Sequence, residues 1–286
     1  MNSDIFSAKR DGLSDIGTGA VSILGMCVLV ALSVCATAQP VWHWEGDFTD
    51  QEQSKLTQWI ARTVSGVEST VAPYPFDVHI HFHRLAGYDQ PVPWANTDRW
   101  PRQSVHFHVD PEYPIDDFLA DWTAPHELSH LLMPYLGREY SWFAEGFASF
   151  MQYQVMVEMG LLSEQQALVQ YREKVGRAGD KFNYPALPFA QAASRLRQDR
   201  QYPTMYWGGA LYFFAVDEKL RQSGSSFVAV LAKYVACCRM PRDSMDELLA
   251  ELDRLSKSAI FSEQMQQFET RPGFPPLPIQ LQQTDR

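Results

Sequence analysis

Two histidines four residues apart constrain this chain more than any other feature of its sequence. His126 and His130 flank the segment Glu127-Leu128-Ser129, and residues four apart share one face of an α-helix, so both imidazoles can bind one ion. Glu145 follows fifteen positions after His130 and can supply a third ligand if its helix packs across the first. Three protein ligands leave a tetrahedral position open to water, which is typical of catalytic zinc sites. The pattern therefore predicts Zn²⁺ held by His126, His130 and Glu145.

Two further side chains near this motif have expected roles. Glu127 projects about 100° around the helix from its neighbour His126, so it can face a zinc-activated water without binding the metal. We expect Glu127 to be the general base of a hydrolytic reaction. Ser149 comes one helical turn after Glu145, and it could either hydrogen bond to a metal ligand or act as a small packing residue.

The wider context of the motif resembles the gluzincin metallopeptidases of the aminopeptidase N and glycyl aminopeptidase type. The matching segments are His-Glu-x-x-His, then Glu145 within Glu-Gly-Phe-Ala-Ser, and finally Tyr206 within Tyr-Trp-Gly-Gly-Ala-Leu. The resemblance covers roughly residues 115–234. It implies zinc ligands His126, His130 and Glu145, the base Glu127, and Tyr206 as hydrogen-bond donor to the oxyanion of peptide-bond hydrolysis. Tyr202 is the second candidate for that donor.

The chain departs from this pattern in two ways. The gap between His130 and Glu145 is shorter than in aminopeptidase N, and no Gly-x-Met-Glu-Asn loop, which grips the free amino terminus of a substrate in that enzyme, lies upstream. Aminopeptidase activity is therefore not implied. In related peptidases an edge strand of the cleft pairs with the extended substrate backbone, and by resemblance we expect residues 104–109 to form that edge.

The order of the elements predicts an α+β fold. Alternating residues indicate strands at 77–83 and 104–109, with an irregular, proline-containing loop from Gly87 to Arg102 between them. From Ile115 onward the patterns favour helices, which we expect near residues 123–134, 141–160 with Ser141 as N-cap, 163–174, 206–220, 227–237 and 244–255. We predict a thermolysin-like, two-lobed metallopeptidase: an N-terminal mixed-β lobe over residues 39–114, a helical zinc-peptidase lobe over residues 115–286, and zinc at their junction.

The first 38 residues have the layout of a secretory signal peptide. Lys9 and Arg10 precede an apolar run from Ala20 to Val34, and Ala36-Thr37-Ala38 forms an A-x-A cleavage pattern. The apolar run is short for a membrane span of ~20 residues. We therefore expect cleavage after Ala38 and a periplasmic or secreted protein, the alternative being an uncleaved anchor that holds the chain at the membrane.

Charge and cysteine content narrow the range of partners. The formal net charge is −10, which argues against nucleic acid as a partner. The resemblance to zinc peptidases implies a peptide or protein substrate. Outside the leader only the adjacent Cys237 and Cys238 remain, so no disulfide framework is available. We expect two ordinary buried thiols there rather than a vicinal disulfide.

Some alternatives stay open at the level of sequence. Five histidines in the two predicted strands, His79, His81, His83, His106 and His108, could form a second metal site or a half-solvated sheet face. A chain with this zinc motif could also be a non-hydrolytic binding or scaffold protein that keeps the gluzincin fold. A third alternative is a zinc hydrolase that cleaves a non-peptidic amide or ester.

Overall fold

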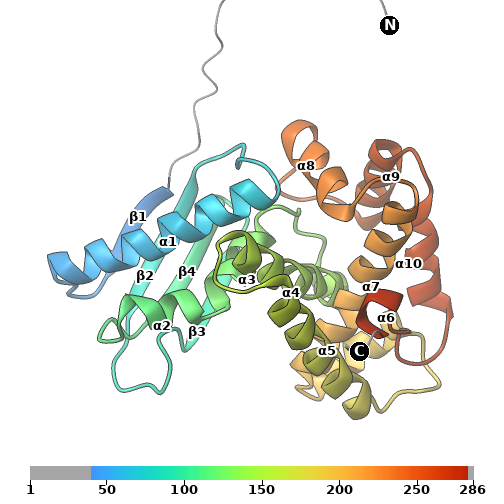
Figure 1. Cartoon of the computed structure of the whole chain (residues 1–286), viewed down its shortest axis with the longest axis horizontal. Coiled ribbons are helices and arrows are strands. Elements are labelled where there is room, and N and C mark those ends of the chain that lie inside the picture. The colour runs from blue at the N-terminus through green and yellow to red at the C-terminus, as the bar shows by residue number, and fades with distance from the viewer. Residues whose placement is uncertain (1–39, 283–286) are drawn as a thin grey trace, which may run out of the picture. The chain divides into compact units, whose positions relative to one another are not determined.

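The computed structural model describes residues 40–282, all of them within the unit Thr37–Arg286. The predicted leader and its cleavage site lie outside the described residues. The elements of the described part follow one another in this order (Figure 1): β1 (Pro40–Glu45), α1 (Asp50–Thr70), β2 (Val78–Arg84), β3 (Trp94–Asp98), β4 (Ser104–Val109), α2 (Ile115–Ala120), α3 (Thr123–His130), the 3₁₀ helix η1 (Arg138–Tyr140), α4 (Ser141–Glu158), α5 (Glu164–Lys181), α6 (Phe189–Gln198), α7 (Tyr202–Gln222), α8 (Phe227–Cys237), α9 (Met245–Ser256), α10 (Ile260–Thr270) and α11 (Ile279–Gln282).

The strands form one four-stranded sheet in the order β1-β2-β4-β3. The first three are parallel to one another, and β3 runs antiparallel to β4 at the edge. Because parallel neighbours need a crossover connection, α1 links β1 to β2 across one face of the sheet. On that face Trp59 packs against Phe82 and Phe107, with ring centroids 6.5 and 5.2 Å apart. The opposite face carries the alternating histidines of the strands.

Six of the helices after the sheet, α3, α4, α5, α7, α8 and α9, lie where they were predicted, whereas α6 and α10 were not predicted and α3 ends at His130 rather than near Pro134. Ser163 and Ser244 each begin a helix with a complete capping box, α5 and α9 respectively. α8 spans Phe227–Cys237, the range expected from its apolar residues. Ser141, expected as an N-cap, is instead the first residue of α4, whose N-cap is Tyr140. The predicted fold class, a small mixed sheet followed by a mainly helical region, is confirmed (Figure 1).

Two expectations about the region upstream of Ile115 were wrong. The segment Gly87 to Arg102 is not wholly irregular, since it contains β3, and residues 104–109 form the inner strand β4, with β3 as the edge strand beside it. The amphipathic helix α1 was not predicted. Thr49 and Glu52 form a capping box at its start, the same signal that marked the later helices.

The cysteines also differ from expectation. Cys237 and Cys238 form a vicinal disulfide at the end of α8, and they are exposed and half-buried respectively rather than buried thiols. Within residues 40–282, every helix is too short or too polar to cross a lipid bilayer.

Candidate metal centre

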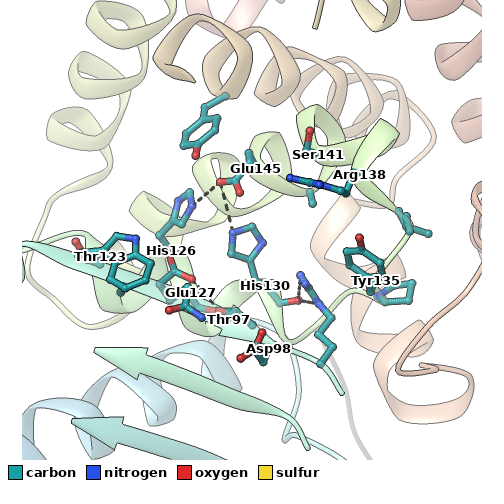
Figure 2. A pocket seen from close by; sticks show the side chains of 18 of the residues that line it. Thr97, Asp98, Thr123, His126, Glu127, His130, Tyr135, Arg138, Ser141 and Glu145 are labelled. Atoms are coloured by element: carbon teal, nitrogen blue, oxygen red, sulfur yellow. Dashed lines mark hydrogen bonds and ion pairs between the residues drawn. The ribbon is translucent and has the colours of Figure 1, made fainter. Parts of the chain in front are cut away.

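The two histidines of α3 meet the glutamate of α4 at one point. Glu145 Oε2 lies 3.2 Å from His126 Nε2 and 3.6 Å from His130 Nε2, and Figure 2 shows the two imidazoles pointing at that carboxylate. Zinc–ligand bonds of about 2.0–2.1 Å at tetrahedral angles put neighbouring ligand atoms about 3.3 Å apart. The spacing of these three side chains therefore fits a single zinc ion.

Burial and hydrogen bonding prepare His126 for metal binding. Its Nδ1 lies 3.0 Å from Gln152 Oε1, a partner that holds the proton on Nδ1 and leaves Nε2 as the free nitrogen. Gln152, rather than Ser149, makes the hydrogen bond to a histidine of this site. Gln152 comes seven residues after Glu145, so both lie on one face of α4, and this spacing is a signal that the sequence analysis did not use.

The charges of the three side chains complement one another. Burial alone would raise the pKa of Glu145, but the charges of His130 and His126 and their hydrogen bonds bring it well below its ordinary range. Burial alone would lower the pKa of His126, and the hydrogen bond and charge of Glu145 raise it overall. Glu145 is thus an anion at neutral pH, as a metal ligand must be.

Two arginines fix the carboxyl end of the metal helix. Arg99, in the loop after β3, donates to the carbonyl oxygens of His130 and Met133 at 2.9–3.1 Å. Arg239, which follows the disulfide, donates to the carbonyl of Leu131 at 3.0 Å. Burial lowers the pKa of Arg99 to about 10, which still leaves it cationic at neutral pH. Cations are favourable at a helix C-terminus, where carbonyl groups lack intrahelical partners.

Glu127 is oriented by the edge strand. The hydroxyl of Thr97 in β3 lies 2.8 Å from Glu127 Oε2 and 2.9 Å from its main-chain oxygen. One ligand atom from each of His126, Glu127 and His130 falls within 4.8 Å of the others, so the carboxylate stands beside the metal position. Thr97 was not predicted, because it comes from a distant segment that carried no local signal.

Tyr206 reaches the site from α7. Its ring centroid is 6.2 Å from that of His126, whereas Tyr202, the second candidate, is exposed and lies beyond Tyr206. Burial, together with the charges of Glu145 and Glu127, raises the pKa of Tyr206 well above its ordinary value. The hydroxyl therefore keeps its proton and can act as a donor.

A glycine contact between α4 and α7 sets the distance between Glu145 and Tyr206. A Cβ on Gly146 would lie 2.3 Å from the carbonyl carbon of Gly209, and one on Gly209 would lie 2.1 Å from the Trp142 oxygen. The two helices thus touch backbone to backbone beside the site. This contact gives the Glu-Gly and Gly-Gly pairs of the sequence motifs a physical reason.

The metal site opens into a cleft of about 1190 Å³ lined by β3, α3, the start of α4 and residues 240–242. Arg138 contributes a guanidinium to its wall, and Figure 2 shows this side chain extending beside Ser141 toward Glu145. Among the ion pairs of residues 40–282, none includes Arg138. The cleft therefore offers an open approach to the metal position and an unpaired cation near it.

Comparison with solved structures shows the family that this fold resembles. An M1 zinc metallopeptidase from Deinococcus radiodurans aligns with a TM-score of 0.53 at 18% identity, over 81% of this chain and 46% of that one. A mutant M1 zinc metallopeptidase from the same organism, bound to a Tyr-Ser-Ala substrate, aligns with a TM-score of 0.54 at 17% identity, over 84% of this chain and 50% of that one. Yeast LTA4 hydrolase in complex with bestatin aligns with a TM-score of 0.56 at 14% identity, over 84% of this chain and 39% of that one.

These comparisons concern the fold. The chain spans half or less of the length of the solved structures named above. No protein-family model matches the sequence, and neither does any curated protein sequence. The predicted resemblance to zinc metallopeptidases is thus confirmed for the three-dimensional fold.

Proposed function

We propose that this chain is a zinc-dependent peptidase that hydrolyses peptide bonds. The observation that carries the proposal is the convergence of His126, His130 and Glu145 within 3.2–3.6 Å at the floor of an open cleft, with Glu127 beside them. The similarity of the fold to M1 zinc metallopeptidases, one of them bound to a Tyr-Ser-Ala substrate, supports the same function.

Each residue of the site has a separate role in this proposal. His126, His130 and Glu145 hold the ion, and zinc when bound polarises the scissile carbonyl and lowers the pKa of water. Glu127 takes a proton from the attacking water and passes it to the departing amine. The Thr97 hydroxyl holds one carboxylate oxygen of Glu127, so the other oxygen stays free for proton transfer.

Tyr206 acts as the hydrogen-bond donor to the oxyanion. Its raised pKa keeps the phenol protonated, and a preorganised donor is worth most where negative charge develops in the transition state. Tyr206 comes to the site from α7, whereas Glu127 is held from the β3 side by Thr97.

We further propose that the substrate binds as an extended peptide along β3. This strand pairs only with β4, so its outer edge leaves main-chain groups unpaired in the sheet, and all of Trp94–Asp98 lines the cleft. Backbone pairing with a sheet edge is a common mode of peptide recognition. Arg138 then favours substrates with a carboxylate on its side of the scissile bond.

We also propose that the enzyme works outside the cytoplasm. The leader-like residues 1–38 are one reason, and the Cys237–Cys238 disulfide is another, because disulfides persist in oxidising compartments. Fractionation of cells that express the full chain, with amino-terminal sequencing of the exported form, tests both export and cleavage after Ala38.

Zinc analysis combined with a peptide-library cleavage profile tests the activity. We expect one tightly bound zinc in the cleft, cleavage of internal or terminal peptide bonds, and loss of cleavage in Glu127→Gln with zinc retained. A wild-type protein that binds zinc yet cleaves no peptide would favour the non-hydrolytic binding or scaffold function. Turnover of ester or non-peptidic amide substrates alone would favour a different zinc hydrolase.

A further inference from the structure

Six of the eight histidines of this chain lie on one face of the sheet, away from the proposed catalytic site. They alternate along three strands with residues that face the core, which is why strand geometry puts them all on the same side. They are His43 in β1, His79, His81 and His83 in β2, and His106 and His108 in β4. The strand histidines of the sequence analysis thus form one surface, joined by a sixth from β1.

Strand register arranges five of these side chains, all but His79, in two cross-strand rows. His43, His81 and His106 are direct neighbours in register, and their rings stack with centroids 4.2 Å apart at each step. In the adjacent row the ring of His83 stacks on His108 at 4.3 Å. Glu45 is the register partner of His83 at the β1 end of that second row.

Three side chains of this face lie close enough to share one ion, and His83 meets its two partners through opposite ring nitrogens. His83 Nε2 is 3.0 Å from His106 Nδ1, and His83 Nδ1 is 3.0 Å from Glu45 Oε2. One ligand atom from each of Glu45, His83 and His106 lies within 4.8 Å of the others. Two imidazoles and a carboxylate are a ligand set that suits zinc and similar divalent transition metals.

We propose that Glu45, His83 and His106 bind a second divalent transition-metal ion, of the zinc type, on the open face of the sheet. His81 supports the set, since its Nδ1 is 3.4 Å from Glu45 Oε1. Asp98 of β3 lies 3.6 Å from His106 Nε2, the ring nitrogen turned away from His83, so this carboxylate faces the outer side of a ligand ring. Two carboxylates beside neutral imidazoles balance the charge of a divalent cation.

Apart from Asp98, which also lines the cleft, the residues of this second site lie outside the cleft lining. Along β3 the side chains alternate, so Asp98 faces the histidines while Thr97 faces Glu127 on the opposite side of the sheet. Loss of the surface metal should therefore leave hydrolysis in the cleft intact, and loss of the cleft metal should leave the surface site intact.

The test counts zinc ions bound per chain in the full-length protein, with Zn²⁺ alone as the probe, by equilibrium dialysis and elemental analysis. We expect the double variant His83→Gln/His106→Gln to bind one zinc fewer than the wild type while keeping its thermal unfolding curve in the absence of metal. Glu45→Gln changes one exposed side chain and should weaken binding of the same ion. An unchanged zinc count in the double variant would overturn the proposal.

A matched control removes a different pair from the same face. His43 Nε2 and His79 Nδ1 are 2.9 Å apart, and neither residue belongs to the cluster of Glu45, His83 and His106. His43→Gln/His79→Gln should therefore keep the wild-type zinc count, and an equal loss there would overturn the proposal in favour of diffuse binding to imidazoles. Glu145→Ala should lose only the cleft ion, so failure of the proposed peptidase site and failure of the surface site give different results.

Discussion

The hydroxyl of Thr97 in β3 lies 2.8 Å from the Oε2 atom of Glu127 in α3, so the sheet edge and the metal helix share a hydrogen bond at the cleft. This contact fixes the carboxylate that we propose as the general base. It also links the strand that would bind substrate to the residue that would move the proton.

Replacement of Thr97 by valine should lower kcat with little change in KM, because valine keeps the shape of the side chain and removes only the donor. A hydrogen bond to a charged group contributes about 1.5–3 kcal/mol, which corresponds to roughly a tenfold or larger loss. Thr97→Ser should restore most of the rate. Steady-state kinetics on the best library peptide decides the matter, and a Thr97→Val enzyme as active as wild type would rule out the orienting role.

Replacement of Gly146 by alanine should destabilise the protein, because the new methyl group would meet the α7 backbone. Overpacking of this kind costs about 1–3 kcal/mol, and a rigid backbone neighbour puts the expected loss at the upper end. Gly176→Ala in α5 is the control, since a Cβ there meets nothing within 4 Å. Denaturant unfolding should show a loss for the first variant and no loss, or a small gain, for the second.

Replacement of Gln152 by leucine should weaken zinc binding in the cleft. The side chain holds the Nδ1 proton of His126, and loss of such a partner typically reduces metal affinity about 10- to 100-fold. Gln152→Glu keeps an acceptor at the same place and should restore most of the affinity. Chelator competition with the metal-free protein measures the dissociation constants, and equal values for leucine and glutamine would contradict the assigned contact.

Removal of the cleft metal should lower thermal stability. An ion that binds only the folded state stabilises it by about 2.7 kcal/mol when its free concentration is 100 times its dissociation constant. Excess chelator should therefore lower Tm, and zinc should restore it. Glu145→Ala should lose most of this response, whereas a variant with the same zinc-dependent shift as wild type would argue against Glu145 as a ligand.

Acidification should lower the free energy of unfolding through the histidines on the open face of the sheet. The pKa values of His79, His81, His106 and His108 are lowered in the fold, first by burial and then by neighbouring cations or imidazoles. The unfolded chain therefore binds more protons just below the ordinary value of 6.5, so the free energy of unfolding falls as the pH drops through that value. Glu45 and Asp98 face the same rings and oppose this effect.

His81→Gln/His106→Gln should flatten this pH dependence in metal-free protein. Urea unfolding at several pH values between neutral and mildly acidic gives the comparison. A double variant with the wild-type slope would show that these rings do not cause it.

The metal centre could be predicted from the sequence because its residues are marked either by their spacing along the chain or by a motif that resembles a known family. His126 and His130 share a helix face by spacing alone, and Glu145 lies within a motif that resembles known peptidases. The structure brings these residues together as expected, while their catalytic roles stay predictions. The residues that hold them in place, Thr97 and Gln152, were not foreseen.

The missed parts of the fold have a common cause. β3 is short and only partly buried, so its pairing with β4 decides its conformation more than its own residues do. Arg99 and Arg239 reach the end of α3 from segments far away in the sequence, and local sequence patterns do not predict such contacts. Periodicity near a helix end reveals neither the exposure of Cys237 nor its bond to Cys238.

The five residues of β3 serve two chemistries through the alternation of their side chains. Insertion or deletion of a single residue in the strand would reverse that alternation, turning the threonine toward the imidazole rows and the aspartate toward the metal helix. Such a change in β3 would disturb both proposed ion sites without altering a ligand of the cleft. Natural variants of this chain should therefore tolerate insertions and deletions in the flanking loops far better than in the strand.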